Sequence, residues 1–395
     1  MYDFNTPVDR TGTGAAKWEY APAPVAGSGF IPLSVADMEF RVAPEIQAAV
    51  TRAAEHGIYG YTAADEPYFT ALRDYLMRRH GYEVKREWHT VTNGVVPAIS
   101  VAVRAFTKPG EGVIVQPPVY YPFFQDIKGN GRAIVENPLV LKNGRYEMDF
   151  DGLEKLCAAP ANTMLILSSP HNPVGRVWTA EELGAVNEIC KRCGVFVVSD
   201  EIHCDLQLEG HKHHSFLALP GEKEHVMVCT AMSKTCNLAG LACSDIFLPG
   251  ETAREAFLAE QERSLGWGIP YFARAAGIAA HTQCDGWIDE MLRTVESNFN
   301  LLYSFIGERL PMLTCIKTEG TYLAWIDMRL LGLTDKEQEQ MHLNAYLALD
   351  EGYIFGKGGS GFARWNLALP QAELLAALKR LEAAVNGILA QRGRI

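Results

Sequence analysis

The sequence lacks an uninterrupted apolar run of the roughly 18 residues that a membrane helix needs, and its start lacks the basic and apolar stretches of a secretion signal. Positive charge is also scarce. The chain has 36 Lys and Arg residues against 47 Asp and Glu, a net charge of -11. This balance disfavours binding to nucleic acid or to an anionic membrane surface. We therefore expect a cytoplasmic protein whose ligands are small molecules.

A disulfide framework is also missing. The nine cysteines are an odd number, and they lie within apolar segments of a long chain, so we expect reduced thiols. Cys190 and Cys193 form a CxxC pair, but no second pair follows at the spacing of a zinc site. His211, His213 and His214 have no carboxylate or cysteine at ligand spacing, which indicates a solvated turn. The sequence therefore predicts no metal site.

The length of 395 residues indicates two domains, one of which can be discontinuous. Short β-rich apolar runs bounded by turn residues predict buried strands at 112–116, 163–168, 195–199 and 226–230. Between the second and third runs, a Thr179/Glu182 capping box and Gly194 bound a predicted helix over 179–193. Strand, helix and strand in this order imply a mostly parallel sheet covered by helices, with ligands at the carboxyl ends of its strands.

The C-terminal part of the chain has a different pattern. It combines long helical stretches with short strands, which we expect at 285–310, 321–326, 362–367 and 371–391. The first forty or so residues predict an irregular arm that packs on this part or on a partner subunit. We expect an arm with part of the small domain at 1–45, a large domain at 46–284 and a small α+β domain at 285–395.

Lys234 is the residue on which the functional interpretation depends. It follows the predicted strand 226–230 and stands where that strand ends and a loop begins. Partial burial at this place disfavours the ammonium form and lowers the pKa, so that more amine is free to attack an aldehyde. Taken alone, a lysine after a strand is more often a surface residue, so its neighbours have to decide.

The segment 233–241 (SKTCNLAGL) resembles the cofactor-lysine segment of fold-type I enzymes, the class I and II aminotransferase superfamily, which use pyridoxal 5'-phosphate (PLP). Further blocks in the same order resemble most closely the branch of C–S lyases and cystathionine β-lyases: VADM at 35–38, YGY at 59–61, TNGVV at 92–96, SDEIH at 199–203 and GFARWN at 361–366. The resemblance covers nearly the whole chain. It implies an α/β fold of three layers around a mostly parallel sheet, a smaller C-terminal domain, and a homodimer with shared active sites.

Several polar and aromatic side chains follow the predicted strands. A buried carboxylate such as Asp200 needs a cationic or donor partner, and the ring nitrogen of PLP is one that would keep the ring able to accept electrons. The resemblance implies that His203 and Asn172 contact the ring 3-oxygen, Asn172 contacting the substrate carboxylate as well. Tyr120 is expected to stack on the ring, with Tyr121 as the competing candidate. The plainer alternatives are a helix N-cap for Asp200, an ordinary Asn-Pro turn for Asn172 and a position in the core for the tyrosine.

The apolar stretch 95–106 predicts a helix that begins next to Asn93-Gly94. Helix N-termini bind anions through free N–H groups and the positive end of the helix dipole. Gly94 permits a close approach of the backbone, and Val95 and Val96 would donate amides to the phosphate.

The remaining phosphate ligands are less complete than in a typical aminotransferase. Thr230 and Ser233 can donate hydroxyls, and the resemblance implies that Tyr61 reaches the phosphate of the neighbouring subunit. Ala231 stands where the family often has Ser, and Ala242 where it often has Arg. Both departures weaken a plain aminotransferase assignment.

The resemblance also assigns the substrate side. Arg364 would bind the α-carboxylate with its planar guanidinium, for which two parallel hydrogen bonds are well suited. Ala36 is expected next to the substrate. Lys234, Asp200 and Tyr61 are the expected catalytic residues, and Lys234 would act both as the cofactor's anchor and as a base at the α-carbon.

These observations predict a PLP-dependent C–S β-lyase that cleaves cystathionine or related cysteine S-conjugates to a thiol, pyruvate and ammonia. The nearest alternative is an aminotransferase, which uses the same residues but needs a keto acid acceptor. A non-catalytic protein that keeps the fold for PLP binding or regulation is a further alternative, because a fold alone does not prove an activity.

Overall fold

A seven-stranded sheet forms the centre of the computed structural model, which describes residues 2–19, 27–264 and 268–392. Its strand order is β2-β10-β9-β8-β7-β3-β4. The bounds are His89–Thr92 (β2), Ser244–Phe247 (β10), Val226–Thr230 (β9), Phe196–Asp200 (β8), Asn162–Ser168 (β7), Gly112–Val115 (β3) and Ala133–Glu136 (β4). β10 alone runs in the direction opposite to the other six strands of this sheet. The predicted mostly parallel sheet is confirmed.

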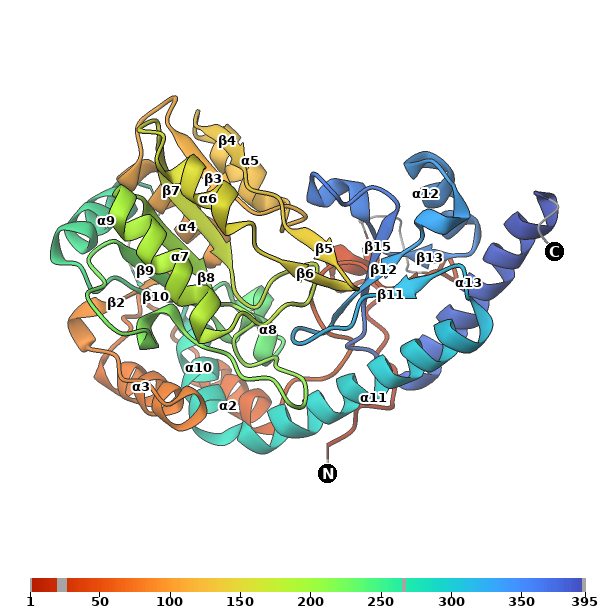
Figure 1. The fold of residues 1–395 in the computed structure, drawn as a ribbon. Coiled ribbons are helices and arrows are strands. Elements are labelled where there is room, and N and C mark those ends of the chain that lie inside the picture. The colour runs from red at the N-terminus through yellow and green to blue at the C-terminus, as the bar shows by residue number, and fades with distance from the viewer. Residues whose placement is uncertain (1, 20–26, 265–267, 393–395) are drawn as a thin grey trace.

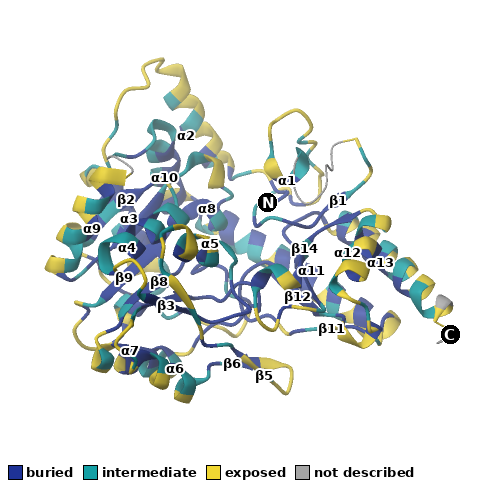
Figure 2. Cartoon of the chain, turned by 90° about the horizontal axis from the view of Figure 1, so that it is seen from above, coloured by how far each residue is buried: buried dark blue, intermediate teal, exposed yellow. Residues whose placement is uncertain are grey.

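The strands of this sheet are apolar because both faces are covered. On β3, Val113 and Val115 join one hydrophobic core, whereas Ile114 between them joins the other, as the two-residue period of a strand requires. The first face is covered by α4 (Val95–Phe106), α5 (Pro122–Gly129) and α9 (Glu251–Ser264), and the second by α6 (Phe150–Cys157) and α7 (Ala180–Cys193). Figure 2 shows buried strands between helices with exposed outer surfaces.

The predicted crossover helix forms as its end signals require. Thr179 caps α7, its side chain accepting from the Glu182 amide while the Glu182 side chain accepts from the cap residue, and Gly194 ends the helix at φ 70°. The three-layer α/β class is therefore confirmed. Strands β2, β4 and β10 have no predicted counterpart, because each of these short strands contains polar residues that interrupt the apolar run.

A second sheet of four antiparallel strands occupies the C-terminal part. Its order is β11-β12-β15-β14, with bounds Thr314–Cys315 (β11), Leu323–Asp327 (β12), Phe362–Asn366 (β15) and Asp350–Glu351 (β14). The helices of this part are α11 (Asp285–Arg309), α12 (Asp335–Asn344) and α13 (Gln371–Gln391). Figure 1 shows α11 running along one side of the molecule from the large sheet to the small one.

The N-terminal arm joins this C-terminal part. β1 (Ile31–Pro32) pairs in parallel with β13 (Leu347–Ala348), and the described part of the arm includes the short helix α1 (Ala16–Glu19). Residues 20–26 of the predicted irregular arm lie outside the described residues. The remaining elements are α2 (Pro44–Glu55), α3 (Glu66–His80), α8 (Met232–Thr235), α10 (Tyr271–Gln283) and the hairpin of β5 (Val140–Lys142) with β6 (Arg145–Glu147).

Candidate active site

A cavity of about 220 Å³ lies at the carboxyl ends of β7, β8 and β9 and is closed on its other side by β15 and residues 35 and 36. This is the place where a mostly parallel sheet collects ligands. Most of the predicted site residues line it: Ala36, Gly94, Val95, Val96, Tyr120, Asn172, Asp200, His203, Ser233, Lys234 and Arg364. Thr230 and Tyr61 are not among the lining residues of the described chain.

Lys234 lies in α8, a single turn of helix directly after β9, rather than in the predicted loop. Its Nζ donates a 2.7 Å hydrogen bond to the carbonyl oxygen of Ala36. Burial lowers the pKa of the amine to about 8, and the positive charge of Arg364 adds to this effect while Asp37 opposes it. About a tenth of the amine is therefore unprotonated at pH 7, far more than for an ordinary lysine.

Asp200 ends β8 with its carboxylate buried at the cavity. Among the described residues the hydrogen bond to this carboxylate comes from the backbone N–H of Ile202, at 3.1 Å. Burial raises the pKa of Asp200 to about 7, although the Ile202 amide and the charge of Lys234 both oppose the rise. A buried acid with so little compensation is suited to a cationic ligand atom.

His203 and Asn172 are both buried on the wall of the cavity. Burial lowers the pKa of His203 to about 3, and the charges of Lys234 and Arg364 act in the same direction. The imidazole is therefore neutral, and its Nδ1 has no hydrogen-bond partner within the described part of the chain. Asn172 accepts a 3.1 Å hydrogen bond from Arg364 Nη1 through its Oδ1, which leaves its amide NH2 to donate.

The N-terminus of α4 points its first amides at the cavity. Gly94 precedes the helix at φ 128° and ψ 161°, a conformation that favours glycine, and no side chain caps the helix there. The N–H groups of Val95 and Val96 thus remain available for an anion. The predicted helix 95–106 is confirmed at both ends.

Tyr120 and Tyr121 both line the cavity, and their ring centroids are 5.6 Å apart. Burial raises the pKa of both phenols, so each hydroxyl stays protonated near neutral pH. The structure thus brings both candidates for ring stacking to the site. The choice between them stays a prediction.

Arg364 lies in the middle of β15 and is buried, with 3% of its side chain exposed. Its Nη1 donates to Asn172 and its Nη2 to Asp350, whereas its Nε has no hydrogen-bond partner among the described residues. The guanidinium also lies over the ring of Phe355, 4.9 Å from the centroid. A buried cation with an unsatisfied donor at a cavity is suited to an anionic ligand group.

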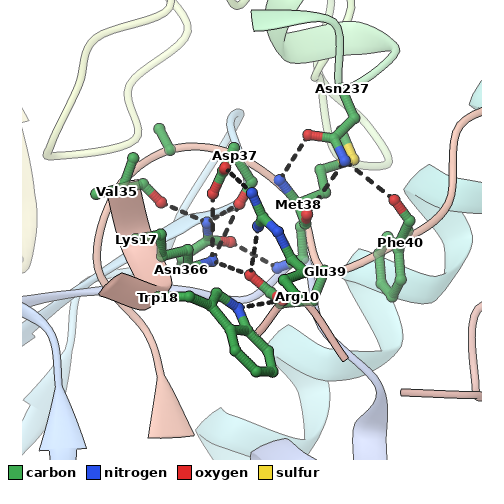
Figure 3. A network of polar contacts seen from close by, with 12 residues as sticks. Arg10, Lys17, Trp18, Val35, Asp37, Met38, Glu39, Phe40, Asn237 and Asn366 are labelled. Carbon is green, nitrogen blue, oxygen red and sulfur yellow. Dashed lines mark hydrogen bonds and ion pairs between the residues drawn. The ribbon is translucent and has the colours of Figure 1, made fainter. Parts of the chain in front are cut away.

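Residues 35–40 form the strap that closes the cavity, and Figure 3 shows how they are held. The Asn237 side chain accepts from the Met38 amide at 2.9 Å and donates to the carbonyl oxygens of Met38 and Phe40 at 3.1 and 3.0 Å. Asn237 comes three residues after Lys234, just beyond the end of α8, so one short segment carries both the amine and the side chain that holds the strap. This connection fixes the position of Ala36 relative to Lys234.

A cluster of charges supports the strap from the N-terminal arm (Figure 3). Arg10 pairs with Asp37 at 2.8 Å and with Glu39 at 3.1 Å, and Lys17 pairs with Glu39 at 2.9 Å. Burial alone would raise the pKa of Asp37, but Lys17 and Arg10 hold it below its usual value. The negative charge next to Ala36 and Lys234 is therefore maintained.

A second buried carboxylate, Asp205, lies behind the cavity and has a complete set of donors. It accepts hydrogen bonds from Tyr75 at 2.6 Å, His80 at 2.8 Å and Thr235 at 2.7 Å. Burial alone would raise its pKa, but these hydrogen bonds lower it. His80, Cys204 and Asp205 lie close enough to hold an ion, but the carboxylate is already saturated, so we interpret this group as structural.

His213 does not lie in the predicted solvated turn. It is buried, and its Nε2 is 3.1 Å from Glu201 Oε2. Glu201 also accepts from Ser199 and from the Phe216 amide. The prediction failed because the partner of His213 lies 12 residues away, so that local polarity gave no sign of burial.

Sequence reasoning missed other lining residues, namely Val35, Asn93, Pro97, Ser168, Ile202 and Ala239. It also missed the supporting residues Tyr322, whose hydroxyl donates to the Ala36 carbonyl at 2.9 Å, and Asp350. Val35, Asn93, Ile202 and Ala239 lie within the motif blocks, which was the available signal. Tyr322 and Asp350 had none, because only tertiary pairing brings them to the site.

The residues at the cavity fit PLP. The free amides of Val95 and Val96 suit a phosphate, the poorly compensated Asp200 suits a protonated ring nitrogen, and the unpartnered Nδ1 of His203 suits a ring substituent. Lys234 supplies an amine with a lowered pKa.

No helix in the described ranges is both long and apolar enough to cross a bilayer.

Residues 28–381 match the family described as Aminotransferase class I and II. The chain is 40% identical to the cystathionine beta-lyase PatB of Bacillus subtilis, over 97% of this chain and 100% of that protein. Cystalysin from Treponema denticola, a solved structure that contains PLP, matches with a TM-score of 0.95 at 38% identity, over 98% of this chain and 99% of that one. A PLP-bound C-S lyase from Staphylococcus hominis matches with a TM-score of 0.91 at 29% identity, over 98% and 99%.

Proposed function

This chain belongs to the class I and II aminotransferase family, and from that premise we propose that it is a PLP-dependent C–S β-lyase. The substrate is cystathionine or a related cysteine S-conjugate, which is cleaved with water to a thiol, pyruvate and ammonia. The observation that carries the proposal is the meeting of an amine of lowered pKa (Lys234), a poorly compensated buried acid (Asp200) and a buried guanidinium (Arg364) at one cavity.

The cofactor would be held from four directions. Lys234 would bond its aldehyde carbon, Asp200 would pair with the ring nitrogen, His203 and Asn172 would contact the 3-oxygen, and Tyr120 would stack on the ring. When bound, PLP supplies an electron sink for the charge that develops at the substrate α-carbon. Asp200 supports this chemistry because its carboxylate favours the protonated ring nitrogen.

The phosphate would be bound by the N-terminus of α4, where Gly94, Val95 and Val96 present the backbone, and by the Ser233 hydroxyl. Thr230, buried at the end of β9, is a further proposed ligand. Ala242 lines the cavity and contributes no charge. The clamp thus depends on amides and hydroxyls rather than on an arginine.

Two side chains would handle the substrate. Arg364 binds the α-carboxylate, with Ala36 beside it, and this orients the α-hydrogen towards Lys234. Once the substrate amine has replaced Lys234 on the cofactor, the freed Nζ would take that proton, and the thiolate would leave from the β-carbon. The hydrogen bond to the Ala36 carbonyl keeps Nζ at the strap, so that substrate binding and proton transfer occur on the same side of the cavity.

A second copy of the chain would complete the site. Ile58, Tyr59 and Tyr61 are exposed by 68%, 57% and 99% on one short segment, and contiguous exposed apolar side chains are typical of an interaction surface. We propose a homodimer in which Tyr61 reaches the phosphate of the partner's cofactor. Tyr61→Phe is then expected to weaken PLP retention without changing the sedimentation coefficient, and unchanged retention would contradict this role.

We also propose a division of the chain into two domains. The proposed PLP-binding domain is 46–284, and the proposed small domain is 285–395 together with the arm at 1–45, which β1 ties to β13. We also propose a cytoplasmic location, because all nine cysteines are free and reduced thiols are usual there.

The test of the function is thiol release from cystathionine by the PLP-loaded protein without any keto acid. A lyase gives many turnovers, with equal amounts of thiol and pyruvate. An aminotransferase releases no thiol: it converts one substrate molecule per site to a keto acid and resumes only when a keto acid acceptor is added. A non-catalytic protein binds PLP and converts no substrate. Either of the last two results contradicts the proposal.

A matched pair of lysine variants makes this test specific. Lys234→Ala is expected to abolish thiol release. Lys223→Ala serves as the control, because Lys223 is also buried and its Nζ donates to the carbonyl oxygens of Pro220 and Gly221 without lining the cavity. Its activity should match that of the unmodified protein.

A further inference from the structure

Asp350 and Arg364 face each other across two neighbouring strands. The antiparallel register of β14 and β15 places them directly opposite, and directly opposite residues present their side chains on the same face. Arg364 Nη2 donates to Asp350 Oδ2. Both side chains are largely buried, with 3% and 12% exposed. The guanidinium of Arg364 is thus already paired with a carboxylate of the protein itself.

The same oxygen of Asp350 also holds the strap. The N–H of Val35 donates to Asp350 Oδ2 at 3.0 Å, and the carbonyl oxygen of Val35 accepts from Asn366 Nδ2 at 2.7 Å (Figure 3). Val35 has φ 47°, a left-handed conformation that a β-branched residue rarely adopts. Its strained backbone is therefore held from both sides, and the next residue, Ala36, carries the carbonyl bonded to Lys234.

A substrate carboxylate on Arg364 would meet this arrangement directly. Asn172 takes Nη1 and Asp350 takes Nη2, which leaves Nε without a partner among the described residues. A carboxylate that binds Nε and Nη2 together must approach the atom that Asp350 already holds. Two negative charges at such a distance repel each other strongly at the dielectric of a partly buried site.

We propose that Asp350 is the internal counter-ion of Arg364, which a substrate carboxylate displaces from the guanidinium on binding. Asp350 is thus a positioning residue that keeps the fork and Val35 in place before substrate arrives, at the expense of carboxylate affinity. Its displacement also frees the Val35 amide. Substrate binding therefore changes how the strap is held, and the Ala36 carbonyl of that strap accepts a hydrogen bond from Lys234. The inference rests on the carboxylate-binding role proposed above for Arg364.

The variant Asp350→Asn tests the proposal, because an amide oxygen can still accept from Arg364 and Val35 while the negative charge is removed. The probe is 3-(methylthio)propionate, a carboxylate that has no amine and cannot react with the cofactor. Calorimetry on the PLP-loaded protein should show a Kd about tenfold lower in the variant, which corresponds to about 1.4 kcal/mol. Equal or weaker binding would overturn the proposal.

Two controls separate this inference from the proposed function. Asp327→Asn removes a carboxylate that pairs with Arg329 on the surface of the same sheet, and it should leave the Kd unchanged. Arg364→Lys should raise the Kd. If it does not, the carboxylate role of Arg364 is wrong and the inference falls with it. If it does while Asp350→Asn fails to tighten binding, only the inference is wrong.

A measurement on the unmodified protein does not depend on any variant folding. In a crystal structure with the bound probe, Asp350 Oδ2 is expected to have left Arg364 Nη2, with a carboxylate oxygen of the probe in its place. An intact Asp350–Arg364 contact next to the bound probe would overturn the proposal.

Discussion

Asp200 and Asp205 are two buried carboxylates five residues apart, and they differ in what surrounds them. Asp205 accepts hydrogen bonds from Tyr75, His80 and Thr235, which lower its pKa. Asp200 accepts one from the Ile202 amide, and burial raises its pKa to about 7. The protein completes the first carboxylate by itself, whereas the second is suited to completion by a ligand.

The difference separates structural burial from functional burial. Burial alone would raise the pKa of both acids, so burial does not identify a site. The number of hydrogen-bond donors around the acid does identify a site. A buried charge without partners destabilises the fold, and such a charge is typical of places where a bound group supplies the missing interactions. Thr235 connects the two regions, since it anchors the turn of α8 that carries Lys234 to Asp205.

The largest effect is expected at Asp200, the carboxylate that a ligand would complete. Asp200→Asn should lower thiol release on the order of 10²- to 10³-fold, because a neutral amide no longer stabilises the positive ring nitrogen. Unfolding of the cofactor-free variant in urea should differ from that of the unmodified protein by less than about 1 kcal/mol, since an amide oxygen still accepts from Ile202. Activity within a factor of two of the unmodified enzyme would contradict the assignment.

The same Asp-to-Asn exchange at Asp205, whose hydrogen bonds the protein itself supplies, should give the opposite pattern, with a larger loss of stability and a smaller loss of activity. Asp205→Asn is expected to lower the free energy of unfolding by about 3 kcal/mol or more, because three buried donors lose a charged acceptor. Thiol release per folded molecule should fall less than in Asp200→Asn. Urea denaturation and an activity assay well below the melting temperature measure the two quantities, and a stability equal to that of Asp200→Asn would remove the distinction.

How far the sequence predicted this comparison depended on how local each signal was. Helices α4 and α7 were predicted well because the apolar spacing and, for α7, the capping box and Gly194 lie in consecutive residues. Lys234, Asp200 and Asn172 were found because each lies at or shortly after the end of a strand of the central sheet and within a motif that resembles the family. Asp205 was not singled out, since its donors come from 30 and from more than 120 residues away.

The substrate side shows the same limit more sharply. Arg364 was predicted from its motif block, but Asp350 lies on a two-residue strand whose register exists only in the folded sheet. The left-handed backbone of Val35 has no local signal either, because nothing in a β-branched residue predicts a positive φ. Strain and cross-strand pairing are properties of tertiary structure, and these the sequence pattern could not supply.

A smaller effect is expected at the guanidinium. Arg364→Lys should raise KM for cystathionine roughly 10- to 100-fold, because an ammonium cannot form both hydrogen bonds of the fork. The visible spectrum of the bound cofactor should stay unchanged, since the cofactor's proposed ligands are untouched. Steady-state kinetics and an absorption spectrum check both points, and loss of the cofactor signal would place Arg364 among the cofactor ligands instead.

The smallest effect sharpens the electrostatic side of the comparison. Capture of PLP by cofactor-free protein requires the unprotonated Lys234 amine, whose pKa is lowered to about 8 by burial. The capture rate should therefore rise about tenfold from pH 7 to pH 9 and then level off, whereas an ordinary lysine would give a rise of roughly 100-fold without a plateau. Stopped-flow absorbance across this pH range decides between the two.

The measurement that tests the central claim most directly is reduction of the PLP-loaded protein with borohydride, followed by peptide mapping by mass spectrometry. If the poorly compensated pocket is the cofactor site, the phosphopyridoxyl group will be found on Lys234, and Lys223 will carry none. A label on another lysine, or no label on protein that binds PLP, would contradict the account.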